Sequence, residues 1–176
     1  KGYGLADVEK ERPVRPDETL FRVGSISKLI TWTMVMQAVE SGRVTLDTDV
    51  GEYLGGSTVS IPREYDDSVT LRHLGTHTPG FSSRPNPGIV LDKESVADLE
   101  TTLSATSPEQ VRPPGELVSY SNYGATVAGH ILGETADTSF AELARSTVFD
   151  PLGMDHTTFQ SVIPDSLPGN PAKPHE

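Results

Sequence analysis

The sequence predicts an α+β fold in which helices predominate and short strands open the chain. Residues 1–24 mix short apolar stretches with two prolines, a pattern typical of strand pieces joined by a turn. In residues 26–40, by contrast, apolar side chains fall at nearly every helical phase, and Gly42 follows as a natural C-terminal cap. We therefore expect a central, mostly buried helix here, with Met34 and Met36 in the core.

Further helical elements follow along the chain. They are expected at residues 47–54, 70–77, 92–103, 123–132 and 139–148. Thr70 is suited to capping the second of these helices, and Ser139 with Glu142 forms a capping box at the last. The segment 82–88, rich in Ser, Pro and Asn, is expected to be a loop. The tail over residues 164–176 holds four prolines and little apolar material, so it is also expected to be a loop.

Composition limits the classes of function. The 176 residues include 14 Lys and Arg against 25 Asp and Glu, and the formal net charge of -11 at pH 7 repels phosphate backbones. We therefore expect no nucleic-acid partner. The absence of cysteine excludes disulfides, thiol catalysis and thiolate metal sites. The longest apolar run, residues 29–39, is too short and too polar to span a bilayer, so no integral membrane segment is expected.

The sharpest motif is Ser25-Ile-Ser-Lys28 at the start of the first predicted helix. A spacing of three places the Lys28 amine on the same helical face as the Ser25 hydroxyl. Such an amine, or a group hydrogen-bonded to it, can take the serine proton as the oxygen attacks an acyl carbon, and a helix N-terminus favours the developing negative charge. The alternative interpretation is that Ser25 merely caps the helix and Lys28 is a surface charge.

A second motif, Tyr120-Ser-Asn122, follows the break at Pro113-Pro-Gly and precedes a predicted helix. Both side chains are therefore expected on a loop that faces a cleft. A phenol beside a cationic lysine loses its proton more easily, so Tyr120 can serve as base and then as acid while the Asn122 amide holds a substrate carbonyl. In the alternative interpretation, Asn122 caps the helix and Tyr120 packs against the core.

The two motifs and their flanking segments resemble the penicillin-recognising serine enzymes, which include class C β-lactamases, D-alanyl-D-alanine carboxypeptidases and family VIII esterases. The segments that carry the resemblance are Leu20-Phe-Arg-Val-Gly-Ser-Ile-Ser-Lys, Leu71-Arg-His-Leu-Gly-Thr-His-Thr-Pro-Gly, Pro113-Pro-Gly, Tyr120-Ser-Asn-Tyr-Gly and Pro151-Leu-Gly-Met. Their order and spacing agree with the family from about Gly2 to Met154. A tyrosine motif in place of Ser-Asp-Asn points to the class C-like branch.

The resemblance implies a β-lactamase/transpeptidase-like fold, in which an antiparallel sheet is flanked by helices and a helical region. It also implies Ser25 as the nucleophile, Lys28 and Tyr120 as proton handlers, and Asn122 as a substrate contact. No cofactor and no metal are expected, and the substrate is a small molecule or peptide. The family resemblance favours an extracytoplasmic or secreted location, although no targeting segment is recognised in these residues.

The sequence departs from the family pattern in one major respect, because no Lys-Thr-Gly or His-Xaa-Gly triad occurs in the 176 residues. We therefore expect a partial domain that lacks the third motif and the C-terminal strands. Residues 1–24 are interpreted as strand remnants, 25–163 as the mostly helical region and 164–176 as loop. One oxyanion donor would then be missing, which predicts weak or no turnover, and unpaired strand edges predict self-association. Gly75 replaces a larger apolar residue.

Three hypotheses of function follow. The first is an acyl-transfer hydrolase in which Ser25 attacks a β-lactam, D-alanyl peptide or ester, and the residues do not decide among these substrates. The second is a non-catalytic penicillin-binding or sensor domain, and the third is a purely structural domain. A zinc site is a weaker idea: a spacing of four would place His73 and His77 on one helical face, but the glutamate of a metalloprotease motif is missing.

Overall fold

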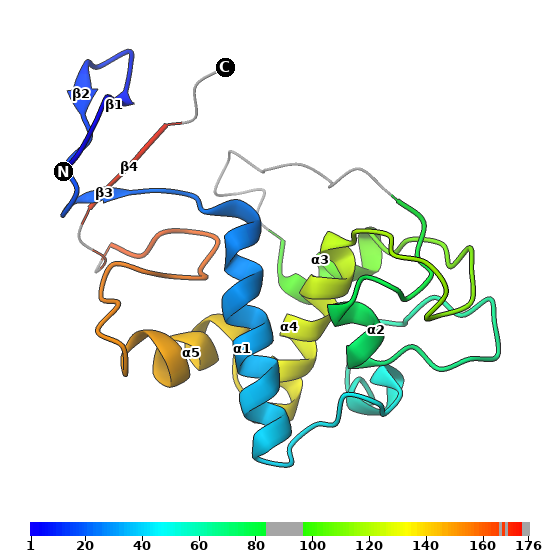
Figure 1. Cartoon of the computed structure of the whole chain (residues 1–176). Helices are drawn as coiled ribbons and strands as arrows, with labels where there is room; N and C mark the ends of the chain where they lie inside the picture. The colour runs from blue at the N-terminus through cyan, green and yellow to red at the C-terminus, as the bar shows by residue number, and fades with distance from the viewer. Residues whose placement is uncertain (84–96, 166, 168, 174–176) are drawn as a thin grey trace.

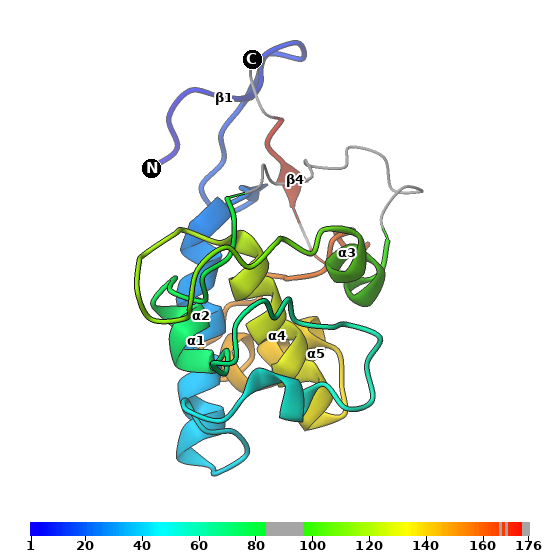
Figure 2. The same cartoon turned by 90° about the vertical axis from the view of Figure 1, so that its right-hand side faces the viewer.

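The computed structural model describes residues 1–83, 97–165, 167 and 169–173. Its helical segments are η1 (Gly24–Ile26), α1 (Ser27–Glu40), η2 (Val50–Tyr53), α2 (Leu71–Gly75), α3 (Leu99–Ala105), α4 (Asn122–Ala136), α5 (Phe140–Ala144) and the π-helical η4 (Arg145–Phe149). The strands are β1 (Leu5–Asp7), β2 (Arg12–Pro13), β3 (Thr19–Leu20) and β4 (Asn170–Pro171). The strands gather beyond the N-terminal end of α1, while the helices form one body below them (Figures 1 and 2).

Helix α4 is the centre of the helical body. It contacts α1, α2, α3 and α5, and residues 124–125 and 127–133 along it are buried. Small residues allow this close packing, because a Cβ on Gly129 would lie 3.5 Å from the Phe140 ring and one on Gly124 would lie 3.4 Å from Leu74. The predicted helix over residues 123–132 is thereby confirmed, with one more residue at its start and four more at its end.

Helix α1 differs from the prediction of a mostly buried central helix. Met34 and Val35 face the core, but Leu29 is 67% exposed and Met36 is 51% exposed. The apolar side chains of α1 point in several directions around the helix, and α4 packs against only one side of it. The other side forms a groove of about 560 Å³, lined by Leu29, Trp32, Thr33, Met36, Gln37 and Glu40. The assignment of Met36 to the core was therefore wrong, because helical periodicity does not report which face another element covers.

The N-terminal strands confirm the prediction for residues 1–24. β1 and β2 form an antiparallel pair, with Leu5 opposite Pro13 and Asp7 opposite Arg12. β3 pairs in parallel with β4, so the tail expected to be loop contains a short strand. The backbone of Ala172 donates to the carbonyl of Leu20 over 2.8 Å. This pairing is a correction that local sequence could not supply, because the partner of the tail lies some 150 residues earlier in the chain.

Helix caps follow the sequence closely. Thr70 Oγ1 accepts from the backbone N–H of His73, and Asp49 caps η2 by accepting from Gly51. Ser139 caps α5, and Gly42 adopts the left-handed conformation expected after α1. The helix predicted over residues 92–103 begins later, because Asp98 caps it and α3 starts at Leu99. Residues 92–96, and most of the predicted loop 82–88, lie outside the described residues.

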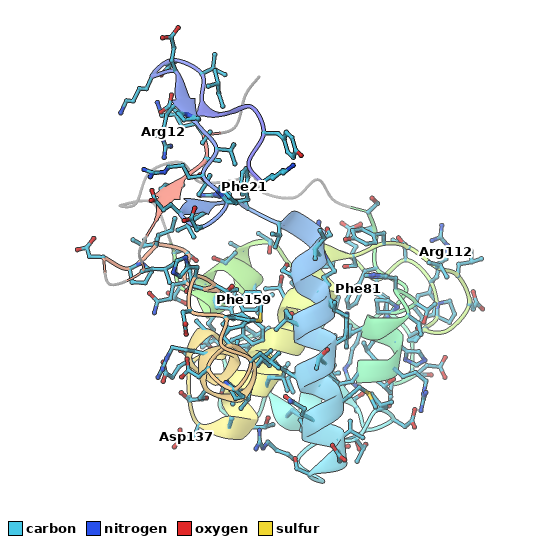
Figure 3. The ribbon with its side chains drawn as sticks, turned by 60° about the vertical axis from the view of Figure 1, so that its left-hand side comes forward. Arg12, Phe21, Phe81, Arg112, Asp137 and Phe159 are labelled. Carbon is cyan, nitrogen blue, oxygen red and sulfur yellow. The ribbon has the colours of Figure 1, made fainter. Side chains whose placement is uncertain are left out.

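Two groups of aromatic rings pack in the helical body, and the view of Figure 3 shows Phe81 and Phe159 on opposite sides of α1. On one side the Phe81 ring packs edge-on against Tyr123, with centroids 5.6 Å apart. On the other side the Phe159 ring lies 4.8 Å from Phe140 and also stacks on Phe149. Phe81 and Phe149 are buried and the other three rings are partly buried, so these contacts belong to the hydrophobic core that α4 and α5 share with α1. Within the described part of the chain, no helix combines the length and the hydrophobicity needed to cross a membrane.

Candidate active site

Ser25 lies in a short turn that leads directly into α1. Gly24 before it adopts a φ of 54°, a left-handed conformation that glycine tolerates best, and the turn η1 then continues into the first residues of α1. Ser27 Oγ donates to the Gly24 carbonyl over 2.7 Å and closes this turn. The Ser25 side chain is left exposed at the N-terminal end of a 14-residue helix, where the helix dipole favours negative charge.

Lys28 joins this turn to the start of α4. Its Nζ donates to Ser25 Oγ over 3.2 Å and to Asn122 Oδ1 over 2.6 Å. Asn122 is the first residue of α4, so the packing of α1 against α4 brings together side chains that are 94 positions apart. The amide oxygen of Asn122 and the hydroxyl oxygen of Ser25 thus share one ammonium group.

Tyr120 completes the cluster from the loop before α4. Its hydroxyl donates to Ser25 Oγ over 2.7 Å, and Lys28 Nζ lies 4.9 Å from the centroid of its ring. Once the phenol is ionised, it can accept hydrogen bonds from Lys28 and from Ser25. These bonds and the lysine charge lower the pKa of the Tyr120 phenol below its ordinary value near 10. A phenol of lowered pKa beside a serine oxygen is suited to exchanging a proton with it.

The structure contradicts both alternative interpretations of these motifs. α1 has Ile26 at its N-cap position with no side-chain hydrogen bond, so Ser25 does not cap it. The cap of α4 is Ser121, whose Oγ accepts from the backbone N–H of Gly124 over 3.0 Å, and not Asn122. Tyr120 is 54% exposed and does not pack in the core. All four predicted site residues therefore meet in one cluster, and none of the four is used as a helix cap.

His77 is a member of the site that the sequence did not reveal. The chain leaves α2 at Gly75, so His73 and His77 do not share a helical face. His73 Nδ1 instead accepts from the backbone N–H of Thr70 at the other end of α2. The His77 ring lies 4.6 Å from the Tyr120 ring, centroid to centroid, at an interplanar angle of 41°. Among the described residues, no three His, Asp or Glu side chains are grouped so as to hold a metal ion.

A second group of serine, histidine and glutamate lies away from this cluster but has a different geometry. Ser57 Oγ donates to the Glu100 carboxylate over 2.8 Å and also lies 2.8 Å from Nε2 of the buried His130. Because the serine proton points at the carboxylate, the imidazole must donate to the serine and cannot act as its base. The backbone of Val59 donates to the same oxygen. This group therefore ties the loop after η2 to α3 and α4.

Comparison with known proteins places this chain in a family. The family model described as Beta-lactamase matches residues 1–170. The chain belongs to the Beta-lactamase family. Within that family it is 32% identical over 168 residues to a β-lactamase of Yersinia enterocolitica, covering 96% of this chain and 40% of that protein. It is also 30% identical over 176 residues to the esterase EstB of Burkholderia gladioli, covering 94% of this chain and 44% of that enzyme.

A solved structure shows the shared Beta-lactamase fold. The octameric penicillin-binding protein homologue from Pyrococcus abyssi superposes with a TM-score of 0.74 at 29% identity, over 89% of this chain and 36% of that one. The fold class expected from the motifs is therefore confirmed. The chain spans less than half the length of the family members it matches here.

The family departure at Gly75 has a structural explanation. A Cβ at this position would lie 3.4 Å from the Trp32 ring, so the indole of α1 occupies the place that a larger side chain on α2 would fill. Trp32 also borders the exposed groove of α1. The small residue on α2 and the large one on α1 are thus complementary.

Proposed function

We propose that Ser25 is the nucleophile of an acyl-transfer hydrolase that works through an acyl-enzyme. The observation that carries this proposal is the convergence of a phenol and an ammonium group on one serine oxygen: the Tyr120 hydroxyl lies 2.7 Å from Ser25 Oγ and Lys28 Nζ lies 3.2 Å from it. The phenol takes the serine proton only in its ionised form, which the lowered pKa favours. A serine with no chemical task has no need of a phenol of lowered pKa and an ammonium group in contact with the same atom.

In the acylation step, Ser25 Oγ attacks the carbonyl carbon of the substrate and its proton passes to the Tyr120 phenolate. The Lys28 ammonium stabilises that phenolate and also contacts Oγ. When the tetrahedral species collapses, the bond from carbon to the leaving nitrogen or oxygen breaks, and Tyr120 returns the proton to that atom. The product is an ester between Ser25 and the acyl group.

Deacylation uses the same groups in the reverse direction. Water attacks the ester carbonyl, the Tyr120 phenolate accepts a proton from the water, and the bond between Ser25 Oγ and the acyl carbon breaks as Tyr120 returns the proton to Oγ. The backbone N–H of Ser25 lies at the start of the helical segment, where such groups favour an oxyanion. Asn122 is held by Lys28 at the edge of the cluster, and we assign its free amide NH₂ group to a substrate carbonyl.

The substrate class is a carboxylic acid derivative with an accessible carbonyl. The relatives named above include a β-lactamase, an esterase and a penicillin-binding protein homologue, which supports a lactam, an ester or a D-alanyl peptide. All three present the same electrophilic carbon to the serine oxygen, and they differ in the leaving group that Tyr120 must protonate.

Intact-mass spectrometry tests the nucleophile. The chain is incubated with a reporter penicillin and, separately, with a fluorophosphonate, alongside Ser25→Ala and the control Ser27→Ala. Ser27 is the other serine of the motif, and its hydroxyl donates to the Gly24 carbonyl instead of joining the cluster. We expect an adduct of one probe mass in the parent and in Ser27→Ala, and none in Ser25→Ala.

The outcome also separates catalysis from binding. An adduct that forms and then disappears as product accumulates supports a hydrolase. A penicillin adduct that persists favours the sensor-like interpretation, in which the acyl-enzyme is the end point. Equal labelling of Ser25→Ala contradicts the proposal altogether. Absence of labelling by both probes contradicts it when it is also found in a longer chain that carries the Lys-Thr-Gly or His-Xaa-Gly motif of the family.

A further inference from the structure

The segment that carries Tyr120 is held by His77 at two points. The backbone N–H of Ser119 donates to the His77 carbonyl over 2.7 Å, and the backbone N–H of Ser121 donates to His77 Nδ1 over 3.2 Å. The tyrosine therefore sits between two amides that are both bonded to the same histidine, and its ring lies against the imidazole. Only the second of these bonds and the ring contact depend on the histidine side chain.

His77 has a backbone conformation that is unfavourable for a residue other than glycine. Its φ is 57°, in the left-handed region that non-glycine residues seldom adopt. Its N–H donates to the Leu74 carbonyl over 3.3 Å, and this turn follows the end of α2 at Gly75. A conformation of this kind persists where other contacts enforce it, and it is common at functional sites.

The imidazole is suited to accepting a hydrogen bond at neutral pH. Partial burial and the nearby Lys28 ammonium lower the pKa of His77 below its ordinary value of 6.5, so the ring is neutral. Since Ser121 donates to Nδ1, the proton of the neutral ring lies on Nε2.

Tyr120 needs such support because packing alone does not hold it. The side chain is 54% exposed and lies in a segment without regular secondary structure, yet its hydroxyl must stay within hydrogen-bond distance of Ser25 Oγ. Misplacement of a catalytic group by about 1 Å can lower a rate by about a hundredfold. The His77 side chain limits that movement in two ways. It accepts a hydrogen bond from the backbone N–H of Ser121, the residue after Tyr120, and its ring contacts the Tyr120 ring.

We propose that His77 is a positioning residue, which holds the Tyr120 phenol against Ser25 through its ring and through the Nδ1 bond to Ser121. The inference rests on the proposed function, because positioning matters only where Tyr120 transfers a proton. Among the described residues, the titratable side chains with a contact to Tyr120 are Lys28 from α1 and His77 itself, and the phenol also donates to Ser25 Oγ.

Two substitutions at this position separate the side chain from the backbone. His77→Gly adopts the left-handed conformation freely but loses the ring and the acceptor. His77→Asn also tolerates this conformation and offers Oδ1 to the Ser121 N–H in place of Nδ1. The matched control is His73→Ala, which removes a bond of the same kind, from Thr70 N–H to imidazole Nδ1, in the capping box of α2.

The first measurement is the rate of fluorophosphonate labelling as a function of pH, at a temperature where each variant is folded by circular dichroism. We expect His77→Gly to label about tenfold more slowly or worse, with the rise of the rate displaced to higher pH. His77→Asn should keep most of the parent's labelling rate and most of its pH dependence. His73→Ala should unfold at a lower temperature and keep the pH dependence of the parent.

The second measurement does not need activity. The ionisation of Tyr120 is followed by near-ultraviolet absorbance, as the difference between each chain and the same chain carrying Tyr120→Phe. In His77→Gly the phenol leaves Lys28 and Ser25 more often, so its pKa should rise toward the ordinary value, while the parent and His77→Asn titrate at lower pH.

The two measurements distinguish the failure of each idea. If the parent is not labelled at Ser25, the proposed function fails, and the absorbance titration still decides whether His77 holds the phenol. If the parent is labelled and His77→Gly keeps its rate, its pH dependence and its phenol titration, the positioning role is overturned. It is equally overturned if His73→Ala displaces the pH dependence as much. If His77→Asn, which keeps an acceptor but lacks the ring, is as impaired as His77→Gly, the part of the role assigned to the Nδ1 bond is overturned.

Discussion

Replacement of Tyr120 by phenylalanine tests the proposed chemistry with the smallest change. The variant keeps the ring, its contact with His77 and its position above Lys28, and it loses only the hydroxyl that donates to Ser25 Oγ. Because the side chain is 54% exposed, we expect the free energy of unfolding to change by less than about 0.5 kcal/mol. Any large loss of activity then reports chemistry and not misfolding.

The size of the expected loss follows from what the hydroxyl does. General base catalysis contributes about a hundredfold to ten-thousandfold, which corresponds to about 3 to 5 kcal/mol of transition-state stabilisation. In the variant, Lys28 still donates to Ser25 Oγ over 3.2 Å and can assist the loss of its proton. We therefore expect a loss in the lower half of that range, about a hundredfold to a thousandfold in the rate of acylation.

The assay is the rate of Ser25 labelling by a fluorophosphonate, read by intact mass, in parallel with urea unfolding. The control is Tyr65→Phe, which makes the same chemical change at a side chain that is 39% exposed and donates to the Val111 carbonyl over 3.2 Å. Tyr65→Phe should keep the parent rate. A Tyr120→Phe variant that is labelled as fast as Tyr65→Phe would refute Tyr120 as the base.

Three further predictions concern charge, packing and association. Lys28→Met removes the ammonium group that lowers the Tyr120 pKa. Since the labelling rate rises with pH as the phenolate forms, this rise should move to higher pH in the variant. A pH profile that does not move contradicts the role of Lys28 in lowering the Tyr120 pKa. Gly75→Leu should destabilise the chain by about 1 to 3 kcal/mol in urea because the Trp32 ring fills the space, whereas Gly75→Ala, whose Cβ fits at 3.4 Å, should not. Met36→Gln, in the exposed groove, should leave stability within about 0.5 kcal/mol and reduce self-association in light scattering; a parent chain that is wholly monomeric rules the association out.

The sequence predicted those features that depend on local spacing. Ser25 in η1 and Lys28 in α1 are three positions apart in one continuous helical turn of the chain, so their contact follows from this short spacing. Caps such as Thr70 and Ser139 also act within three residues. Asn122 and Tyr120 join the cluster from nearly a hundred positions away, and only the resemblance to a known family predicted that.

The sequence could not determine which apolar surfaces are covered or how distant backbone groups pair. The pattern of α1 is apolar on several sides, but whether Leu29 and Met36 are buried depends on neighbouring elements, and α4 packs on the other side. The strand β4 exists because its backbone meets β3, which no local propensity encodes.

What the sequence alone determined is the set of candidate reactive groups and the helices at whose starts they lie, because residue type and short spacing fix both the chemistry and the local geometry. What only the tertiary structure decided is how those groups are held. The left-handed turn at His77 and its bond to Ser121, 44 positions away, arise from the packing of α2 beside the start of α4. A contact of that kind is a property of the assembled chain, since neither segment specifies it without the other.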